Sequence, residues 1–158
     1  MLSMKEFMKK VNISKKRYVL DWIEKDLIPG VQKAENDEYL FPESARRPYI
    51  ARCSNKASAK TIRASIVNAC IKRRHISPST YNLSDGEFES CINDLISCGL
   101  IVRREEDGII YYDSTSKSDA YSNCDIKVIG QKVQELLAVV EPVLSIAAST
   151  VAIVSTLM

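Results

Sequence analysis

Two serine–glutamate pairs mark where helices of this chain begin, and they constrain its fold more than any other local feature. Ser3 is followed three residues later by Glu6, and Ser84 by Glu87, a spacing at which serine and glutamate cap a helix N-terminus reciprocally. Each pair lies in a segment with two helical patterns, and two short segments around a polar turn follow. The expected fold is therefore mainly α-helical with small β-hairpins.

The N-terminal segment predicts two short helices and a hairpin. Helices over residues 4–10 and 15–25 are separated by a short turn, which is the helix-turn-helix arrangement. The sequence Leu-Ile-Pro-Gly at 27–30 ends the second helix. Short segments at 31–34 and 39–41 flank a polar turn and predict a β-hairpin, or wing.

The first turn of the second predicted helix, which Ser14 is expected to cap, carries three consecutive cations at the positive end of the helix dipole. Cations are unfavourable at this end of a helix, so three of them in a row suggest a functional role. In helix-turn-helix proteins this turn enters the major groove of DNA. A solvated basic face is the alternative interpretation. The predicted binding residues for double-stranded DNA are Lys15, Lys16, Arg17, Lys33, Arg46 and Arg47.

The charge distribution favours the same half of the chain. The net charge of the 158 residues is only +2, but residues 1–63 hold 14 Lys/Arg against 8 Asp/Glu, whereas residues 64–158 hold 8 against 12. Such an asymmetry suggests that the N-terminal half meets a polyanion.

These residues resemble a known family. The run ISKKRYVLDWIEKDLIPG at 13–30 and the hairpin ending YLFP at 39–42 are similar to the winged helix-turn-helix of MerR-type regulators and small excisionases. The resemblance covers residues 1–50 and implies a DNA-binding domain there. Asp26 stands where such domains usually have glycine. The long dimerising helix and effector-binding cysteines of full MerR regulators are not recognisable, so metal or drug sensing is not implied.

Residues 57–116 predict a second unit of the same kind. A helical segment over 57–74 precedes the helix capped by Ser84, and a hairpin with an Asp-Gly turn follows at 100–112. In general outline this order resembles the winged-helix modules of replication and transcription proteins.

The charges of the second unit differ from those of the first. Its Ser84-capped helix carries four carboxylates and no Lys or Arg, which would repel phosphates. A protein partner or a spacer role is therefore predicted for residues 57–116. The DNA-binding alternative rests on Lys72, Arg73 and Arg74 and on the hairpin residues Arg103 and Arg104.

Residues 126–158 are strongly apolar and predict a long C-terminal helix. Apolar residues recur with alternating spacings of four and three, which is typical of a helix-packing seam. A homo-oligomer, with a dimer favoured, is expected. A membrane anchor stays open as an alternative, although the uncharged stretch 143–158 is shorter than a bilayer requires. The predicted oligomerisation residues are Ile129, Val133, Leu136, Val140, Val143, Ala147, Val154 and Leu157.

The predicted fold class is thus mainly α with small β-hairpin wings: two tandem winged helix-turn-helix-like modules, at 1–50 and 57–116, plus a long apolar helix at 126–158. One histidine, five cysteines and no Cys-x-x-Cys pair give no basis for an enzyme, a metal site or a cofactor. With no secretory signal at the start, a cytoplasmic location is expected.

The leading functional prediction is a sequence-specific double-stranded DNA-binding protein, a small bacterial or mobile-element transcriptional regulator that acts as a homo-oligomer. One alternative is an excisionase-like architectural factor that bends DNA. Another is an interaction or tail-anchored adaptor protein that does not bind DNA.

Overall fold

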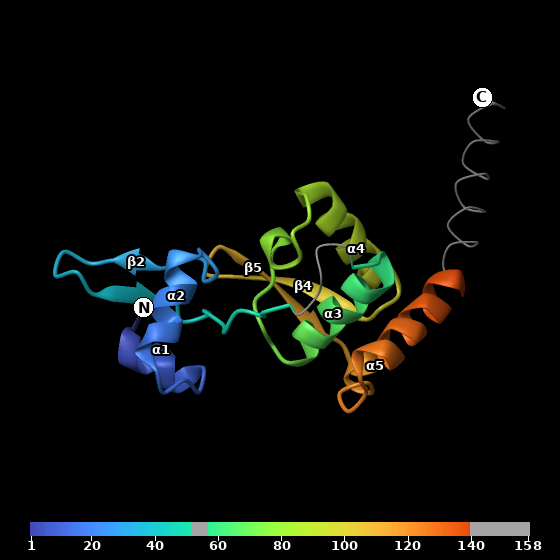
Figure 1. The fold of residues 1–158 in the computed structure, drawn as a ribbon, viewed down its shortest axis with the longest axis horizontal. Coiled ribbons are helices and arrows are strands. Elements are labelled where there is room, and N and C mark those ends of the chain that lie inside the picture. The colour runs from blue at the N-terminus through green and yellow to red at the C-terminus, as the bar shows by residue number, and fades with distance from the viewer. Residues whose placement is uncertain (52–56, 140–158) are drawn as a thin grey trace, which may run out of the picture.

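The computed structural model describes residues 1–51 and 57–139, which form an elongated molecule with two units (Figure 1). In the N-terminal unit two helices pack beside a three-stranded antiparallel sheet of strand order β1-β3-β2. The elements of this unit are β1 (Leu2–Ser3), α1 (Met4–Lys10), α2 (Lys16–Glu24), β2 (Gln32–Lys33) and β3 (Tyr39–Phe41).

The core of the N-terminal unit forms between the helices and the sheet. Phe7 of α1 stacks on Phe41 of β3, with ring centroids 4.3 Å apart. Val19 and Trp22 bury the inner face of α2 against the same cluster. The capping box at Ser3 and Glu6 is present as predicted, so the start of α1 is fixed by local hydrogen bonds.

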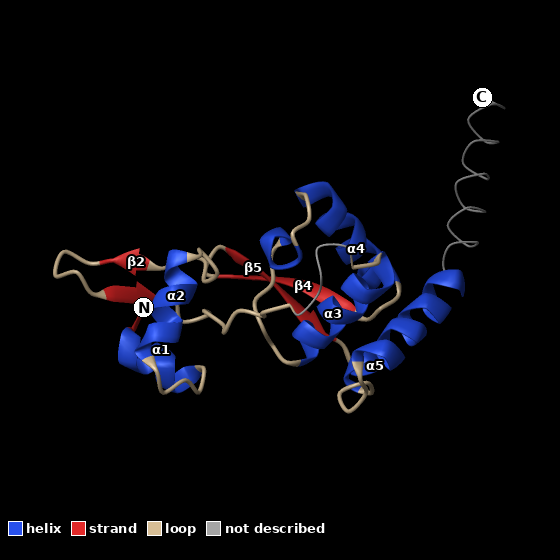
Figure 2. Cartoon of the chain, in the orientation of Figure 1, coloured by secondary structure: helices blue, strands red, loops and turns tan. Residues whose placement is uncertain are grey.

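The second unit is mainly helical and carries a two-stranded antiparallel hairpin (Figure 2). The predicted capping box of Ser84 and Glu87 begins α4, and Asp107 and Gly108 form the turn of the hairpin. The elements of this unit are α3 (Ala59–Ile71), the 3₁₀ helix η1 (Pro78–Tyr81), α4 (Asp85–Ser97), β4 (Ile101–Glu106), β5 (Ile109–Ser114), α5 (Ser116–Asp119) and a helix over residues 126–139.

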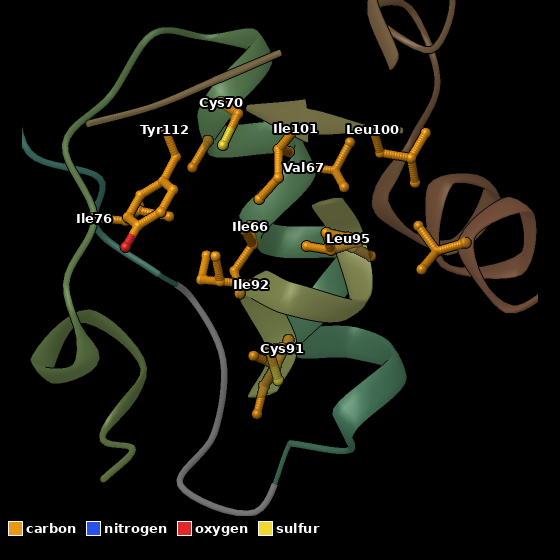
Figure 3. Packing of buried hydrophobic residues seen from close by; sticks show 14 of the residues in the cluster. Ile66, Val67, Cys70, Ile76, Cys91, Ile92, Leu95, Leu100, Ile101 and Tyr112 are labelled. Carbon is orange, nitrogen blue, oxygen red and sulfur yellow. The ribbon is translucent and has the colours of Figure 1, made fainter. Parts of the chain in front are cut away.

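Apolar side chains from α3, α4 and the hairpin form the core of the second unit (Figure 3). Ile66 of α3 and Ile92 and Leu95 of α4 are fully buried, and Ile101 and Tyr112 cover them from the hairpin. The apolar residues Phe88, Cys91, Ile92 and Leu95 of α4 are buried, whereas Ile96 is 37% exposed.

The predicted fold class is wrong. The chain is mainly helical with two small antiparallel sheets, but it is not a tandem pair of winged helix-turn-helix-like modules. The first predicted wing is part of a three-stranded sheet, because Leu2 and Ser3 pair with Phe41 and Leu40 of β3. The second predicted wing does not project freely, because its turn contacts residues 42–51, which we call the linker between the units, through Asp107 and Ser44.

The predicted long apolar C-terminal helix is also absent from the described residues. The described helix over 126–139 is amphipathic and lies along the second unit (Figure 1). Ile129 and Val133, predicted to join chains, are instead buried in the core of this chain, and Leu136 packs against that core. The remaining predicted oligomerisation residues, Val140, Val143, Ala147, Val154 and Leu157, lie outside the described residues.

The described residues contain no helix that combines the length and the apolar character needed to cross a membrane.

Candidate nucleic-acid interface

The first turn of α2 presents three exposed cations, which we call the α2 cluster: Lys15, Lys16 and Arg17. The expected cap at Ser14 is wrong, because the N-cap is Lys15 and no side chain caps the helix. The first turn also holds no acidic residue. Its positive charge therefore adds to that of the helix dipole and is not offset locally.

No member of the α2 cluster forms an ion pair with another described residue. The guanidinium of Arg17 lies 5.0 Å from the ring centroid of Tyr18, and its Nη2 donates to the Tyr18 hydroxyl at 3.3 Å. Tyr18 is itself 44% exposed. This turn thus offers cations and an aromatic ring to solvent, because Val19 and Trp22 occupy the buried face of the helix.

Lys33, on β2, is exposed but has a carboxylate partner. Its Nζ lies 2.7 Å from Asp37 Oδ1, and both side chains are more than half exposed. An exposed pair of this kind contributes about 0.2–1 kcal/mol and is readily exchanged for another anion. Lys33 therefore stays accessible on the hairpin.

The sequence predicts a DNA contact for Arg46, but the structure places this side chain against Asp113. Its guanidinium Nη1 pairs with Asp113 Oδ1 at 2.6 Å, and the two side chains are only 10% and 14% exposed. The same guanidinium lies 4.5 Å from the ring centroid of Tyr111. Arg46 is a largely buried structural cation, because the linker docks on β5.

Hydrogen bonds between residues 44–49 and the second unit hold the junction between the two units. Ser44 N donates to Asp107 Oδ2 at 3.0 Å, and the Ser44 hydroxyl lies 3.2 Å from the Tyr111 hydroxyl. Tyr49 N donates to His75 O at 2.9 Å, and His75 N donates to Arg47 O at 3.0 Å. Residues 44–49 are therefore held against the second unit.

The docked linker brings Arg47 close to the basic sequence after α3. Four side chains, which we call the junction cluster, line one open cleft there: Arg47, Lys72, Arg73 and Arg74. Burial, together with the charge of Arg47, lowers the pKa of Arg74. The sequence placed Arg47 with the N-terminal unit and Lys72 to Arg74 with the second, so their proximity could not be predicted from spacing.

The basic residues of the second hairpin are paired. Arg103 Nη2 donates to Glu89 Oε2 at 2.6 Å, and this hydrogen bond raises the pKa of Arg103. Arg104 Nε lies 3.3 Å from Asp113 Oδ2. Among the alternative DNA-binding residues, Lys72, Arg73 and Arg74 are therefore freer to bind an anion than Arg103 and Arg104.

Three of the described cysteines, Cys70, Cys91 and Cys98, are buried and are poor nucleophiles. Burial raises the pKa of Cys70 to about 12, and burial is also the main cause of the raised pKa values of Cys91 and Cys98. These thiols are protonated at neutral pH, and the thiolate is the reactive form. They fill space in the core of the second unit, as Figure 3 shows for Cys70 and Cys91.

His75 predicts a pH dependence of stability. Burial, and then the charge of Arg46, lowers the pKa of His75 to about 4, whereas an unfolded histidine titrates near 6.5. Below pH 6.5 the histidine of the unfolded chain binds a proton, whereas His75 of the folded chain stays neutral. The free energy of unfolding therefore falls as pH decreases towards 4. We expect a loss of about 2 kcal/mol between pH 7 and about pH 5.

Urea unfolding at these two pH values tests this expectation. His75 is the only histidine, so the variant His75→Gln should lose most of the pH dependence in that range. An unchanged slope in the variant would assign the dependence to another group.

A scan against protein-family models finds no match to this chain, and a comparison with curated proteins finds no significant similarity.

Proposed function

We propose that this protein binds double-stranded DNA through the first turn of α2. The observation that carries the proposal is the α2 cluster: three consecutive exposed cations without a carboxylate partner among the described residues. Cations at a helix N-terminus are unfavourable by about 0.3–1 kcal/mol each, and phosphates would neutralise them. The N-terminal turn of a helix is also the part that contacts base edges when a helix enters the major groove.

Two neighbouring features support this surface. Lys33 lies exposed on the hairpin of the same unit, where it can contact a flanking phosphate. Tyr18 adds an exposed hydroxyl next to Arg17, and tyrosine hydroxyls are common donors to phosphate oxygens.

The resemblance of residues 13–42 to MerR-type regulators and excisionases supports a regulatory use of this binding. We propose a sequence-specific regulator that acts as a homo-oligomer. Footprinting on sites selected from a random duplex library tests this role. A single palindrome is expected, and direct repeats with bending would instead indicate an architectural factor.

Charge reversal of the α2 cluster is the decisive test of DNA binding. Fluorescence anisotropy on a labelled random-sequence duplex compares the wild type with Lys16→Glu/Arg17→Glu between about 50 and 200 mM salt. We expect the variant to bind at least about tenfold more weakly, and its dependence of log K on log salt to be shallower by about 2.

The matched control is Lys127→Glu/Lys132→Glu, which makes the same charge change on the helix over 126–139, at the opposite end of the described structure (Figure 1). Lys132 has only an exposed pair with Glu135. This control is expected to keep wild-type affinity. An equal loss of DNA affinity in both double variants would show that the effect comes from net charge alone. Wild-type affinity of Lys16→Glu/Arg17→Glu would show that the α2 cluster does not bind DNA.

A further inference from the structure

An open cleft of 520 Å³ lies where the two units meet. Its walls come from the end of α1 and the turn after it, from the linker, from residues 72–74 after α3, and from the end of β4. The basic side chains that line it are Lys10, Arg46, Arg47, Lys72, Arg73 and Arg74.

Most of this positive charge is not neutralised within the described structure. Asp113 pairs with Arg46, but no member of the junction cluster forms an ion pair with another described residue. Lys10 donates to the backbone carbonyl of Glu43 and forms no ion pair with a described residue, although its charge also acts on the carboxylate of Asp107. The lining carboxylates are Glu43, whose Oε1 already lies 3.6 Å from the N-terminal amino group, and Glu106. The cleft therefore has an excess of cations.

The backbone of Arg73 is a second and independent observation. Six described residues other than glycine have positive φ, and five of them are Asn or Asp, which tolerate the left-handed conformation. The sixth is Arg73, with φ of 52°. The chain thus keeps a long cationic side chain where glycine or asparagine is favoured, and such exceptions concentrate at functional sites.

We propose that the junction cluster binds backbone phosphates of the same DNA duplex that meets the α2 cluster. This inference rests on the proposed function. The two sites are close, because Asn12 lines the cleft and only four residue steps, at most about 14 Å of chain, separate it from Lys16. A helix in the major groove, which is about 12 Å wide, has phosphates on both sides at a similar distance.

The chemistry of the cleft favours a phosphodiester backbone over a free nucleotide. None of the described residues that line it is aromatic, so a base would find no ring on which to stack. Arginine and lysine side chains from three separate segments instead match a row of phosphates.

The variant Arg73→Gly separates a binding role from a structural one. Glycine removes the charge and relieves the left-handed backbone, so the urea midpoint should stay equal or rise. DNA affinity should fall about threefold to tenfold, with a salt dependence that is shallower by about 1. The matched control is Asn82→Gly, because Asn82 has φ of 53° at the C-cap of η1 and does not line the cleft. It should keep wild-type DNA affinity.

The same anisotropy titrations include Lys16→Glu/Arg17→Glu, so the two proposals can fail separately. Weaker binding by the α2 variant with wild-type binding by Arg73→Gly would overturn the junction site and leave the proposed function standing. Weaker binding by Arg73→Gly alone would move DNA binding from the α2 cluster to the junction. Calorimetric titration with tripolyphosphate tests whether the cleft binds a free polyphosphate. If the wild type bound tripolyphosphate with micromolar affinity, and Arg73→Gly lost this binding but kept wild-type DNA affinity, the ligand of the cleft would be a free polyphosphate and not the duplex.

Discussion

Replacing Tyr111 with alanine is expected to lower the free energy of unfolding by about 3–5 kcal/mol, the range for truncating a buried aromatic side chain. Tyr111 is 1% exposed and lies outside both apolar cores, at the junction of the units. Its ring lies 5.7 Å from the His75 ring and under the guanidinium of Arg46. The variant therefore leaves a cavity beside a buried charge.

Urea unfolding at neutral pH, followed by circular dichroism, measures this loss. Tyr18→Ala is the matched control, because Tyr18 is 44% exposed and the same truncation there should change stability by about 0.5 kcal/mol or less. Tyr111→Phe keeps the ring and loses only the contact with the Ser44 hydroxyl, at a cost of about 1 kcal/mol. Equal losses for Tyr111→Ala and Tyr18→Ala would show that the junction does not stabilise the fold.

Replacing Arg46 with methionine is expected to destabilise the protein by about 3 kcal/mol, because the substitution leaves the largely buried carboxylate of Asp113 without its main partner. The remaining contact, from Arg104 Nε at 3.3 Å, comes from a side chain that is 58% exposed. Methionine keeps most of the length of the arginine side chain, so the measured loss reports mainly on the charge.

Lys25→Met provides the comparison for Arg46→Met. Lys25 pairs with Asp21 at 2.8 Å on the surface of α2, where both side chains are about half exposed. Breaking this pair should cost less than about 1 kcal/mol. Adding Asp113→Asn to Arg46→Met should recover part of the loss, since it removes the unpaired charge. If Arg46→Met lowered the free energy of unfolding as little as Lys25→Met does, the result would contradict a stabilising ion pair at the junction.

Some elements of this fold follow from short-range sequence signals. The boxes at Ser3 and Ser84 start α1 and α4 where the sequence predicts, and the Asp107-Gly108 turn closes the second hairpin. Each signal acts within a few residues, so spacing alone carries it. The predicted start of α2 is one residue too early, because Lys15, rather than the better capping residue Ser14, is the N-cap.

Among the candidate DNA-binding residues, too, some are placed by local sequence signals and others only by long-range contacts. Exposure of the α2 cluster was predictable, since the apolar residues Val19 and Trp22 set which face of α2 is buried. The burial of Arg46 was not predictable, because the pattern of residues 42–50 carries no sign of its partner on β5. The junction cluster cannot be predicted from the sequence for the same reason, although Lys72, Arg73 and Arg74 form a basic run.

The sequence by itself determined where most helices and hairpins of this protein form and which of their faces are apolar, because capping, periodicity and turn chemistry act between near neighbours. Tertiary structure alone decided that Leu2 and Ser3 complete a sheet with β3, and that the helix over 126–139 packs into the core of its own chain. It also decided the junction, where the bonds from Ser44 and Arg46 join residues 63 to 67 positions apart. Contacts of that range depend on how the finished units fit together, which no local pattern specifies.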